Sequence, residues 1–453
     1  MEIGELKILL ALEPTWTVSL NGLEFLPLRS SEISVENSSI RLGRYSRTIL
    51  DLQWLRPNVV RIRGRARFRS QADTITLYPG DHLPPVIDLR RRRRTFQAQL
   101  GKALCAYFGV PKVERQTLYS DRRHGIGGAY PRFLVGKHAV IAVDPDESSA
   151  VINGVMRAAL LWAPLVRRRV VIVVPRGREQ TLSARLRVMP HLRKTFEWLQ
   201  WDGEAITSLK DTVAEPETYV QDFAPPDAGA EVAQICSRAP GLLHSVPDIA
   251  GKAISIRLRG IEVARVSEKA TVYPLGEPIE QVIQELDAVR RYRSRHPLAR
   301  AHEERWLESN LISEIGQVLP SVDVQHIYPQ VPSFMGAERN VIDLLTVTNE
   351  GRLVVIELKT SADPDLPLQA LDYWIAVERH RKAGDFIKKG YFTGRTLRNE
   401  PAVLVLVAPL LAYHKTVGRV MGALPAEAPL IEIGINQSWK RQIKVLRRRG
   451  MLG

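Results

Sequence analysis

The sequence predicts a mixed α+β fold in several domains: a β-rich N-terminal module, an α/β middle domain and a C-terminal mixed sheet flanked by helices. Its 453 residues exceed the length over which one hydrophobic core usually keeps growing, about 250 to 300 residues. Residues 1–90 alternate apolar and polar positions in short runs between turn signals, which is typical of strands. After residue 90, helix-like and strand-like runs alternate, which is typical of α/β domains.

Composition and charge are those of a globular protein that attracts polyanions. Hydrophobic residues make up 45% and charged residues 25% of the sequence, which are ordinary values for a packed domain. Lys and Arg number 64 against 49 Asp and Glu, so the formal net charge is +15. This excess favours nucleic acid as the partner, although an Arg-rich proteome would produce the same balance.

The two cysteines, Cys105 and Cys236, lie in apolar, helix-like contexts. They indicate neither a disulfide framework nor a cysteine zinc site, which favours a reducing cytoplasm. The N-terminus lacks a basic segment followed by a long apolar run, and no run reaches the length of a membrane span. We therefore expect a cytoplasmic protein with no membrane partner.

Domain boundaries are expected where the pattern changes. The acidic stretch at 214–230, rich in Pro and Ala, is the clearest linker candidate. The expected parts are a β-rich module at 1–90, an α/β domain at 91–213, a linker with a short helix at 214–250, a strand pair with a helix at 251–299, an α/β unit at 300–435 and a basic tail at 436–453.

The unit at 300–435 begins with a helix and a β-hairpin. Residues 301–319 place their apolar side chains on one helical face, with Glu304 and Glu308 beside it. Two apolar runs, VIDLLTV and RLVVIELK, follow as predicted strands. Gly351 between them suits the left-handed position of a short hairpin loop.

The predicted hairpin brings two carboxylates together. We expect Thr348 to pair with Arg352 at the neck of the loop. In that register Asp343 lies opposite Glu357, and cross-strand Cβ atoms are roughly 5 Å apart. Lys359 is two residues beyond Glu357 and shares its face. The two carboxylates could therefore bind one divalent cation with an ammonium group beside it.

These groups are the parts that phosphodiester hydrolysis needs. A cation polarises the phosphoryl group and lowers the pKa of the attacking water, and a nearby positive charge stabilises or orients that nucleophile. The alternative is an ordinary Glu357–Lys359 salt bridge on a solvated strand. The apolar surroundings argue against it, because buried carboxylates are costly without a cation or hydrogen-bond donors.

A further helix is predicted at 366–381, with Pro367 in its first turn. Gln369 near its start could reach a substrate phosphate or a metal-bound water, and simple solvation is the alternative. Tyr373 lies one turn further, where it either contacts nucleic acid or packs into the core.

This arrangement resembles the PD-(D/E)XK nuclease superfamily: a helix with Glu, a strand with an acidic metal ligand, a strand with Glu-x-Lys and a helix with Gln. VIDLLTV, VVIELK and LQALDYW look most like RecB-type and NucS-type nucleases, and the resemblance covers about residues 300–435. It implies a restriction-endonuclease-like mixed sheet there. Ile342 stands where the family name has proline, so the Glu-x-Lys half is the specific part.

The resemblance also implies roles for the residues. Asp343, Glu357 and the backbone carbonyl of Leu358 would bind Mg²⁺ or Mn²⁺. Lys359 would position the attacking water, and Gln369 would complete the catalytic set.

Other residues are candidates for supporting contacts. Glu304 or Glu308 would add an outer-shell contact to the metal. The tail QSWKRQIKVLRRRG could clamp a phosphate backbone, with a solvated amphipathic end as the alternative. The expected nucleic-acid contacts are Tyr373, Trp439, Lys440, Arg441, Arg447 and Arg448.

The middle domain repeats the order of helices and strands seen near the C-terminus. HAVIAVDP can be laid over LVVIELKT so that Ala142 meets Glu357 and Asp144 meets Lys359. The domain would then be a degenerate nuclease-like copy kept for substrate binding or for packing as a pseudo-dimer. The alternative is an unrelated α/β module.

The sequence thus predicts a metal-dependent nuclease acting on DNA, in repair or in restriction of foreign DNA. RNA is the alternative substrate, and a homodimer is left open. Two rival hypotheses are a catalytically silent nucleic-acid-binding protein with the same fold, and a scaffold whose basic charge is incidental.

Overall fold

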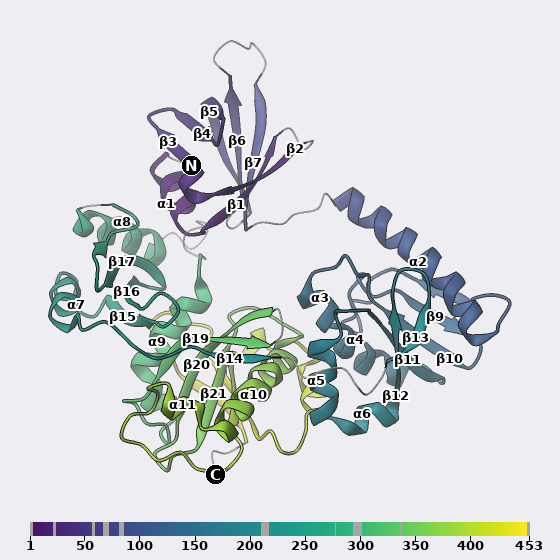
Figure 1. The fold of residues 1–453 in the computed structure, drawn as a ribbon. Helices are drawn as coiled ribbons and strands as arrows, with labels where there is room; N and C mark the ends of the chain where they lie inside the picture. The colour runs from purple at the N-terminus through teal and green to yellow at the C-terminus, as the bar shows by residue number, and fades with distance from the viewer. Residues whose placement is uncertain are drawn as a thin grey trace. The chain divides into compact units, whose positions relative to one another are not determined.

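The computed structural model describes the chain except for residues 1–2, 21–23, 57–58, 67–71, 81–85, 210–216, 277, 293–300, 336–337 and 451–453. The fold is mixed α and β, as predicted, with several sheets (Figure 1). The chain separates into two compact units. The first holds Met1–Pro85, Pro225–Asp248 and Lys252–Ser309, and the second holds Val86–Ala224, Ile249–Gly251 and Asn310–Gly453.

The first unit begins with an antiparallel sheet in the order β2-β1-β7-β6-β5-β4-β3. Alternation of residue types builds it: in β6, Val60 and Ile62 are buried while Arg61 and Arg63 are exposed. The elements are α1 Ile3–Ala11, β1 Thr15–Leu20, β2 Glu24–Arg29, η1 Ser30–Glu32, β3 Ile33–Glu36, β4 Ser39–Leu42, β5 Tyr45–Arg56, β6 Val59–Arg65 and β7 Asp73–Pro79.

A second, four-stranded antiparallel sheet belongs to the same unit. The predicted strand pair of residues 251–299 forms its β16 and β17. Ile283 and Leu286 of helix α8 pack on this sheet against Ile256 and Val263. The elements are α7 Gly229–Cys236, β15 Leu243–Asp248, β16 Ala253–Leu258, β17 Ile261–Ser267, β18 Thr271–Val272 and α8 Ile279–Tyr292.

The second unit contains two sheets. The first belongs to residues 86–209, called the middle module below, and has the order β13-β12-β11-β10-β9-β8. Its elements are α2 Val86–Phe108, β8 Arg115–Thr117, β9 Arg132–Val135, β10 His138–Ala142, α3 Ser149–Asn153, α4 Val155–Trp162, η2 Ala163–Leu165, β11 Arg169–Pro175, α5 Gln180–Val188, α6 Pro190–Thr195, β12 Phe196–Trp201 and β13 Ile206–Ser208.

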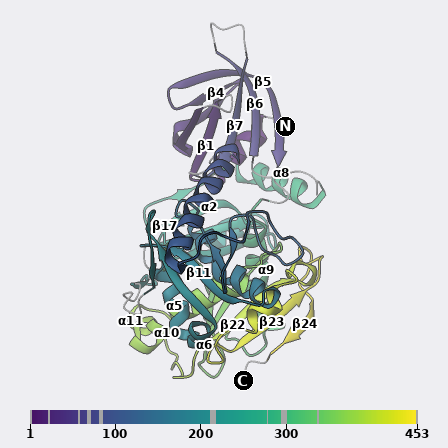
Figure 2. The same ribbon diagram turned by 90° about the vertical axis from the view of Figure 1, so that its right-hand side faces the viewer.

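The other sheet of the second unit belongs to residues 217–224 and 310–450, called the C-terminal module below. Its strand order is β14-β19-β20-β21-β22-β23-β24, and Figure 2 shows β22, β23 and β24 side by side. Its elements are β14 Thr218–Val220, β19 Tyr328–Met335, β20 Glu338–Val347, β21 Leu353–Leu358, α10 Leu366–Ala383, α11 Asp385–Lys388, β22 Val403–Pro409, η4 Leu410–Ala412, α12 Val417–Met421, β23 Leu430–Ile435 and β24 Val445–Arg449.

Helix α9, Glu303–Val318, precedes this sheet in the chain, and the boundary between the two units falls within it. Its apolar positions from Leu311 onward, including Ile315 and Val318, are buried. No helix in the described part of the chain is both long and apolar enough to cross a membrane.

The expected linker at 214–250 differs from the structure. Residues 218–220 form β14, which pairs with the edge of the C-terminal sheet at β19. Just beyond it, the ring of Phe223 packs edge-on against Tyr328, with 4.7 Å between centroids. Its N–H donates to the Lys389 carbonyl at 2.9 Å. The composition of this stretch favours a linker, because the sequence does not show that β19 has an open edge with which residues 218–220 can pair.

The two sheets of the second unit share one topology. From β8 to β13 and from β19 to β24, two antiparallel pairings are followed by two parallel pairings and a last antiparallel one. In both, helices cross over after the third strand, at α3 and α4 in one and at α10 in the other. This is the order of elements on which the predicted internal copy was based.

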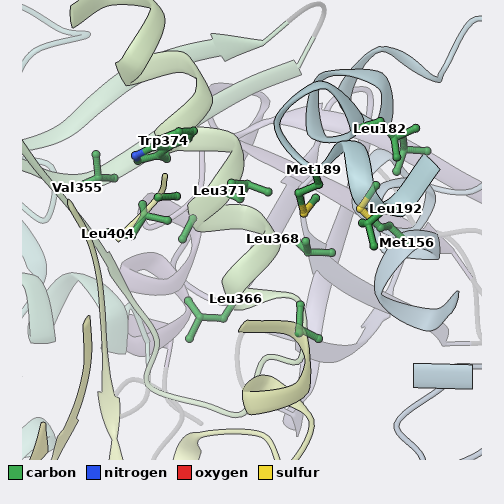
Figure 3. Packing of buried hydrophobic residues seen from close by; sticks show 14 of the residues in the cluster. Met156, Leu182, Met189, Leu192, Val355, Leu366, Leu368, Leu371, Trp374 and Leu404 are labelled. Atoms are coloured by element: carbon green, nitrogen blue, oxygen red, sulfur yellow. The ribbon is translucent and has the colours of Figure 1, made fainter. Parts of the chain in front are cut away.

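The two modules pack through their helices. Leu368 and Leu371 of α10 belong to one buried cluster with Met189 and Leu192 of the middle module (Figure 3). Within this contact Arg185 of α5 donates two hydrogen bonds of 2.7 Å to the carboxylate of Asp372 on α10. Both side chains are less than a tenth exposed, so the modules share one core and a buried ion pair.

Candidate active site and its counterpart in the middle module

The hairpin of the C-terminal module has the predicted register. Leu344 pairs with Ile356 and Val347 with Leu353. The Thr348 N–H donates to the Arg352 carbonyl at 2.8 Å across the neck of the loop. Gly351 has a φ of 94°, and a Cβ there would lie 2.3 Å from the Thr396 carbonyl oxygen. The loop therefore requires glycine for both its conformation and its close packing.

The register places Asp343 opposite Glu357, where the ladder ends. The last recorded pair is Leu344 with Ile356. On the other side of β20, the pairing with β19 passes over Asp343 and Gln330, and Gln330 has a φ of 51°. Asp343 thus sits at a local distortion of the sheet. Its side chain turns toward the hairpin, where Oδ2 accepts the Leu358 N–H at 2.8 Å.

Glu357 and Lys359 share one face, as predicted. Glu357 is 2% exposed, and its Oε1 accepts a hydrogen bond of 3.2 Å from Lys359 Nζ. The Lys359 side chain is 16% exposed, so its ammonium lies at the margin between the core and solvent. The contact is the salt bridge named as the alternative interpretation, but it lies in a buried setting and not on a solvated strand.

The residues present fit a divalent cation. In a strand, the N–H and C=O of one residue point to the same edge. The Leu358 N–H points to Asp343, whereas the Lys359 N–H donates to Val407 on β22 at 3.1 Å. The Leu358 carbonyl therefore lies on the Asp343 side, so the oxygen groups that could serve as ligands at this end of β21 are the two carboxylates and this carbonyl.

Within the described residues, no group of three or more His, Cys, Asp or Glu side chains is placed to hold an ion. A site here would thus depend on two side-chain carboxylates and a backbone oxygen, which is the set that the resemblance implied.

Helix α10 begins at Leu366, with Pro367 in the first turn as predicted. Gln369 is half-buried in that turn, and its N–H donates to the Asp365 carbonyl at 3.0 Å. Tyr373 is partly buried and packs against the hydrophobic cluster of the second unit. The packing alternative for Tyr373 therefore has direct support, and the role of Gln369 stays a prediction.

The two glutamates of α9 lie in the first unit. Glu308 is buried, and Arg257 donates to its Oε1 at 2.6 Å. This ion pair satisfies the charge of Glu308 inside its own unit. Glu304 is half-buried. The outer-shell role of either residue stays a prediction.

The expected nucleic-acid contact of Trp439 is wrong. The Trp439 side chain is 4% exposed, and its carbonyl accepts from Asn310 at 3.2 Å. A buried ring cannot stack on a base. Lys440 lies over this ring at 5.7 Å from its centroid, and Arg441 is exposed, so these two stay candidates for contact with a phosphate backbone.

The basic tail is part of the sheet. Residues 445–449 form β24, which pairs with β23. Arg447 bonds to the buried carboxylate of Glu432, and Arg448 donates to the carbonyl of Val318 at 2.5 Å. Both arginines therefore have structural partners, and the prediction of a clamp is corrected to an edge strand with mainly structural contacts.

Strand β10 of the middle module takes the place of β21. The following parallel strands end at Pro175 in the middle module and at Pro409 in the C-terminal module. Three residues before each proline, the strand pairs with Ile141 in the middle module and with Glu357 in the C-terminal module. Ile141 therefore occupies the position of Glu357.

The predicted overlay of Ala142 on Glu357 is wrong by one residue. Ala142 packs in the cluster on the α2 face of its sheet. Ile141 and Val143 face the cluster shared with α4, just as Val355, two residues before Glu357, faces α10. A slip of one residue moves every side chain of a strand to the other face. Val143 and not Asp144 is thus the counterpart of Lys359.

The counterpart of Asp343 is an arginine. Ile141 pairs with Arg132 on β9, as Glu357 lies opposite Asp343. Arg132 is 7% exposed and donates to the Tyr119 carbonyl at 2.8 Å. Burial lowers the pKa of its guanidinium. The middle module therefore has no acidic pair at this point and carries a cation there.

Arg132 lines a cavity of about 700 Å³ that sequence reasoning missed. The cavity lies between β8, β9, the 118–131 loop and the segment that leads into β11. Its wall contains one carboxylate, Asp121, and the arginines Arg115, Arg122, Arg123, Arg132, Arg167 and Arg168. These arginines come from four separate segments, so no local motif marks them.

No protein-family model matches the chain, and a search of curated proteins finds no match either. Among solved structures, the chain is similar to Can2 from Sulfobacillus thermosulfidooxidans in complex with cyclic tetra-adenylate (cA4), at 7% sequence identity and a TM-score of 0.16. The comparison covers 60% of this chain and 89% of the Can2 chain. Similarity at this level carries no argument about function.

Proposed function

We propose that the protein is a nuclease that hydrolyses phosphodiester bonds, most simply those of DNA, with Mg²⁺ or Mn²⁺ at the hairpin of the C-terminal module. The observation that carries the proposal is the arrangement at the end of β21, where Asp343 accepts the Leu358 N–H and Lys359 donates to the buried Glu357. A repair or restriction setting is part of the same proposal.

Each residue has a task that its position supports. Asp343, Glu357 and the Leu358 carbonyl would hold the cation, which when bound supplies a Lewis acid to the scissile phosphate. Lys359 donates hydrogen bonds and positive charge, so it would orient the attacking water and stabilise the charge that develops on phosphate. Gln369, in the first turn of α10, would contact the same phosphate or water.

Lys359 would change partners when the cation arrives. Its bond to Glu357 offsets the charge of a carboxylate that is 2% exposed, because an uncompensated charge in such a place is costly. A divalent cation would take over that compensation. The ammonium group would then be able to bind the water or a phosphate oxygen.

A second candidate function is favoured by the same contact. Since Lys359 already neutralises Glu357, the hairpin is electrostatically stable without a metal ion. The chain could then bind nucleic acid without cutting it. Direct measurement of cleavage separates the two functions.

The test is cleavage of single-stranded, duplex, flapped and mismatched DNA, and of single-stranded RNA, by the full chain with Mg²⁺, Mn²⁺ or EDTA. We expect metal-dependent cutting, lowered roughly 100-fold or more in Glu357→Gln and in Lys359→Ala. The matched controls are Glu427→Gln and Lys382→Ala, exposed positions of the same module. Equal cutting by all five proteins would assign the activity to a contaminant, and binding of nucleic acid without cutting would establish the second function.

A further inference from the structure

The arginine-lined cavity of the middle module is a strongly positive site with few internal partners. Arg168 pairs with Glu114 at 2.8 Å, and the buried Arg132 donates to a backbone carbonyl. By contrast Arg122, Arg123 and Arg167 are exposed. Among the described contacts, the side chains of these three make no hydrogen bond or ion pair. Clustered cations without counter-charges repel one another, so the cavity favours an anionic ligand.

An aromatic ring stands at the same cavity. Tyr119 lines it and is 80% exposed, which is a high value for a large ring with no packing role. Trp162 also contributes to the wall. Guanidinium groups that bind phosphate, together with an exposed ring that can stack on a base, are the combination that single-stranded nucleic acid recognises.

The cavity is physically connected to the candidate active site. Arg157, on α4, donates to Asp365 at 2.6 Å, and Asp365 lies on the loop between Lys359 and α10. The same guanidinium donates to the carbonyl of Gly125, in the loop that walls the cavity, at 2.6 Å. One buried arginine thus joins the loop of the cavity to the loop that follows Lys359.

A second contact supports this connection. Lys415, in the segment after β22, donates to the carbonyl of Arg122 at 3.1 Å. Strands β21 and β22 are parallel. The segments that follow them therefore leave the sheet at the carboxyl-terminal ends of these strands, the same end at which Glu357 and Lys359 lie. The cavity loop therefore contacts a segment that leaves the C-terminal sheet at the same end as Glu357 and Lys359.

We propose that this cavity binds a single strand of nucleic acid through its phosphodiester groups, with Arg122, Arg123 and Arg167 as the contacts to phosphate and Tyr119 as the stacking surface. The inference rests on the proposed function, since the bound strand is taken to be the substrate or its product. The middle module would then hold the strand while the C-terminal module cuts it.

The experiment measures binding apart from cleavage. Fluorescence anisotropy of a labelled 12-nucleotide single strand is recorded in EDTA, over a range of salt concentrations, with the full chain. We expect Arg122→Ala/Arg123→Ala to weaken binding at least tenfold. Two lost contacts should also lower the slope of log K against log salt by roughly 1.4, because each neutralised phosphate on a single strand contributes about 0.7.

Matched variants keep the result interpretable. Lys382→Ala/Lys388→Ala removes two positive charges from exposed positions of α10 and α11 and should leave the affinity within twofold. Arg122→Lys/Arg123→Lys keeps the charge and should recover most of the affinity and the salt slope. Melting temperatures should match, since the two arginines are exposed.

Several outcomes would overturn the inference. Equal losses of affinity in Arg122→Ala/Arg123→Ala and in Lys382→Ala/Lys388→Ala would show a general charge effect. Competition by tripolyphosphate at the same total phosphate as an unlabelled strand would show that the cavity takes free polyphosphate and not nucleic acid. Absence of cleavage with normal binding would remove the nuclease proposal alone, and normal cleavage with unaltered binding in Arg122→Ala/Arg123→Ala would remove the cavity proposal alone.

Discussion

The middle and C-terminal modules share the order and direction of six strands but differ at the same point of the fold. In the C-terminal module, Asp343 lies opposite Glu357, and Lys359 follows. In the middle module, Arg132 lies opposite Ile141, with Val143 two residues on. The C-terminal module has two carboxylates there, whereas the middle module carries a guanidinium.

The difference shows that packing maintains the fold and that a few strand-end residues decide the chemistry. The apolar positions facing the shared core are retained in both modules, for example Ile172 and Leu406. Isoleucine at the position of Glu357 is compatible with this packing, because Ile141 is itself buried in the shared core. The middle module can thus keep its architecture while favouring ligands of opposite charge.

The largest expected effect tests which of the two modules carries the proposed nuclease activity. Asp343→Asn removes a charged ligand from the hairpin and should lower metal-dependent cleavage roughly 100-fold or more. Asp144→Asn changes the acid that ends the corresponding segment of the middle module and should leave cleavage within twofold. Initial rates on one DNA substrate check both. A large loss in Asp144→Asn would place a catalytic centre in the middle module.

The second prediction, with a smaller expected effect, concerns the stability of the core that the two modules share. Arg185→Ala leaves Asp372 buried and without its two guanidinium bonds, so the free energy of unfolding should fall by roughly 3 to 5 kcal/mol. Arg168→Ala removes a solvent-screened pair with Glu114 and should leave the free energy of unfolding nearly unchanged.

Urea unfolding of both variants, followed by fluorescence, checks this difference. A single transition that shifts in Arg185→Ala would agree with modules that unfold together. If both variants lose the same small amount of unfolding free energy, the buried ion pair does not couple the modules. The two modules could then not be treated as one cooperative unit.

The smallest expected effect concerns pH. Burial, followed by the nearby Asp146 and Glu147, raises the pKa of the Asp144 carboxyl, although a hydrogen bond from the Asp146 N–H opposes the shift. Its contribution to stability is therefore fully present below the ordinary aspartate pKa of 3.8 that applies in the unfolded chain, and it is lost as pH rises through the folded-state pKa.

Asparagine keeps the acceptor oxygen but does not titrate. The stability of Asp144→Asn relative to the wild type should thus increase from pH 3.5 to pH 7. Thermal unfolding across this range measures the difference. A constant difference, or one that decreases with pH, would show that the Asp144 carboxyl is not desolvated.

Much of the candidate site could be predicted because it is local. Thr348 and Arg352 are four residues apart, and the loop between them sets the register that brings Asp343 opposite Glu357. The start of α10 at Leu366 was predicted from Pro367 in the same way. The β-rich N-terminal sheet followed from alternation alone, since a half-buried strand repeats every two residues.

Other features depend on partners that are distant in sequence. Trp439 was predicted to bind nucleic acid, since its basic neighbours are visible in the sequence and its burial is not. Residues 218–220 have the composition of a linker, but in the structure they form a strand that pairs with the edge of the sheet at β19. The counterpart of Glu357 was placed one residue too late because an apolar run such as HAVIAV does not show which face meets which helix.

The sequence by itself determined the hairpin, its register and the three residues that could perform hydrolysis, because the contacts that arrange them span a short loop. Only the tertiary structure decided that six arginines from four segments line one cavity and that Arg157 joins the loop of this cavity to the segment after Lys359. Asp365 and Arg157 are far apart along the chain, and only the packing of one module on the other brings them within 2.6 Å.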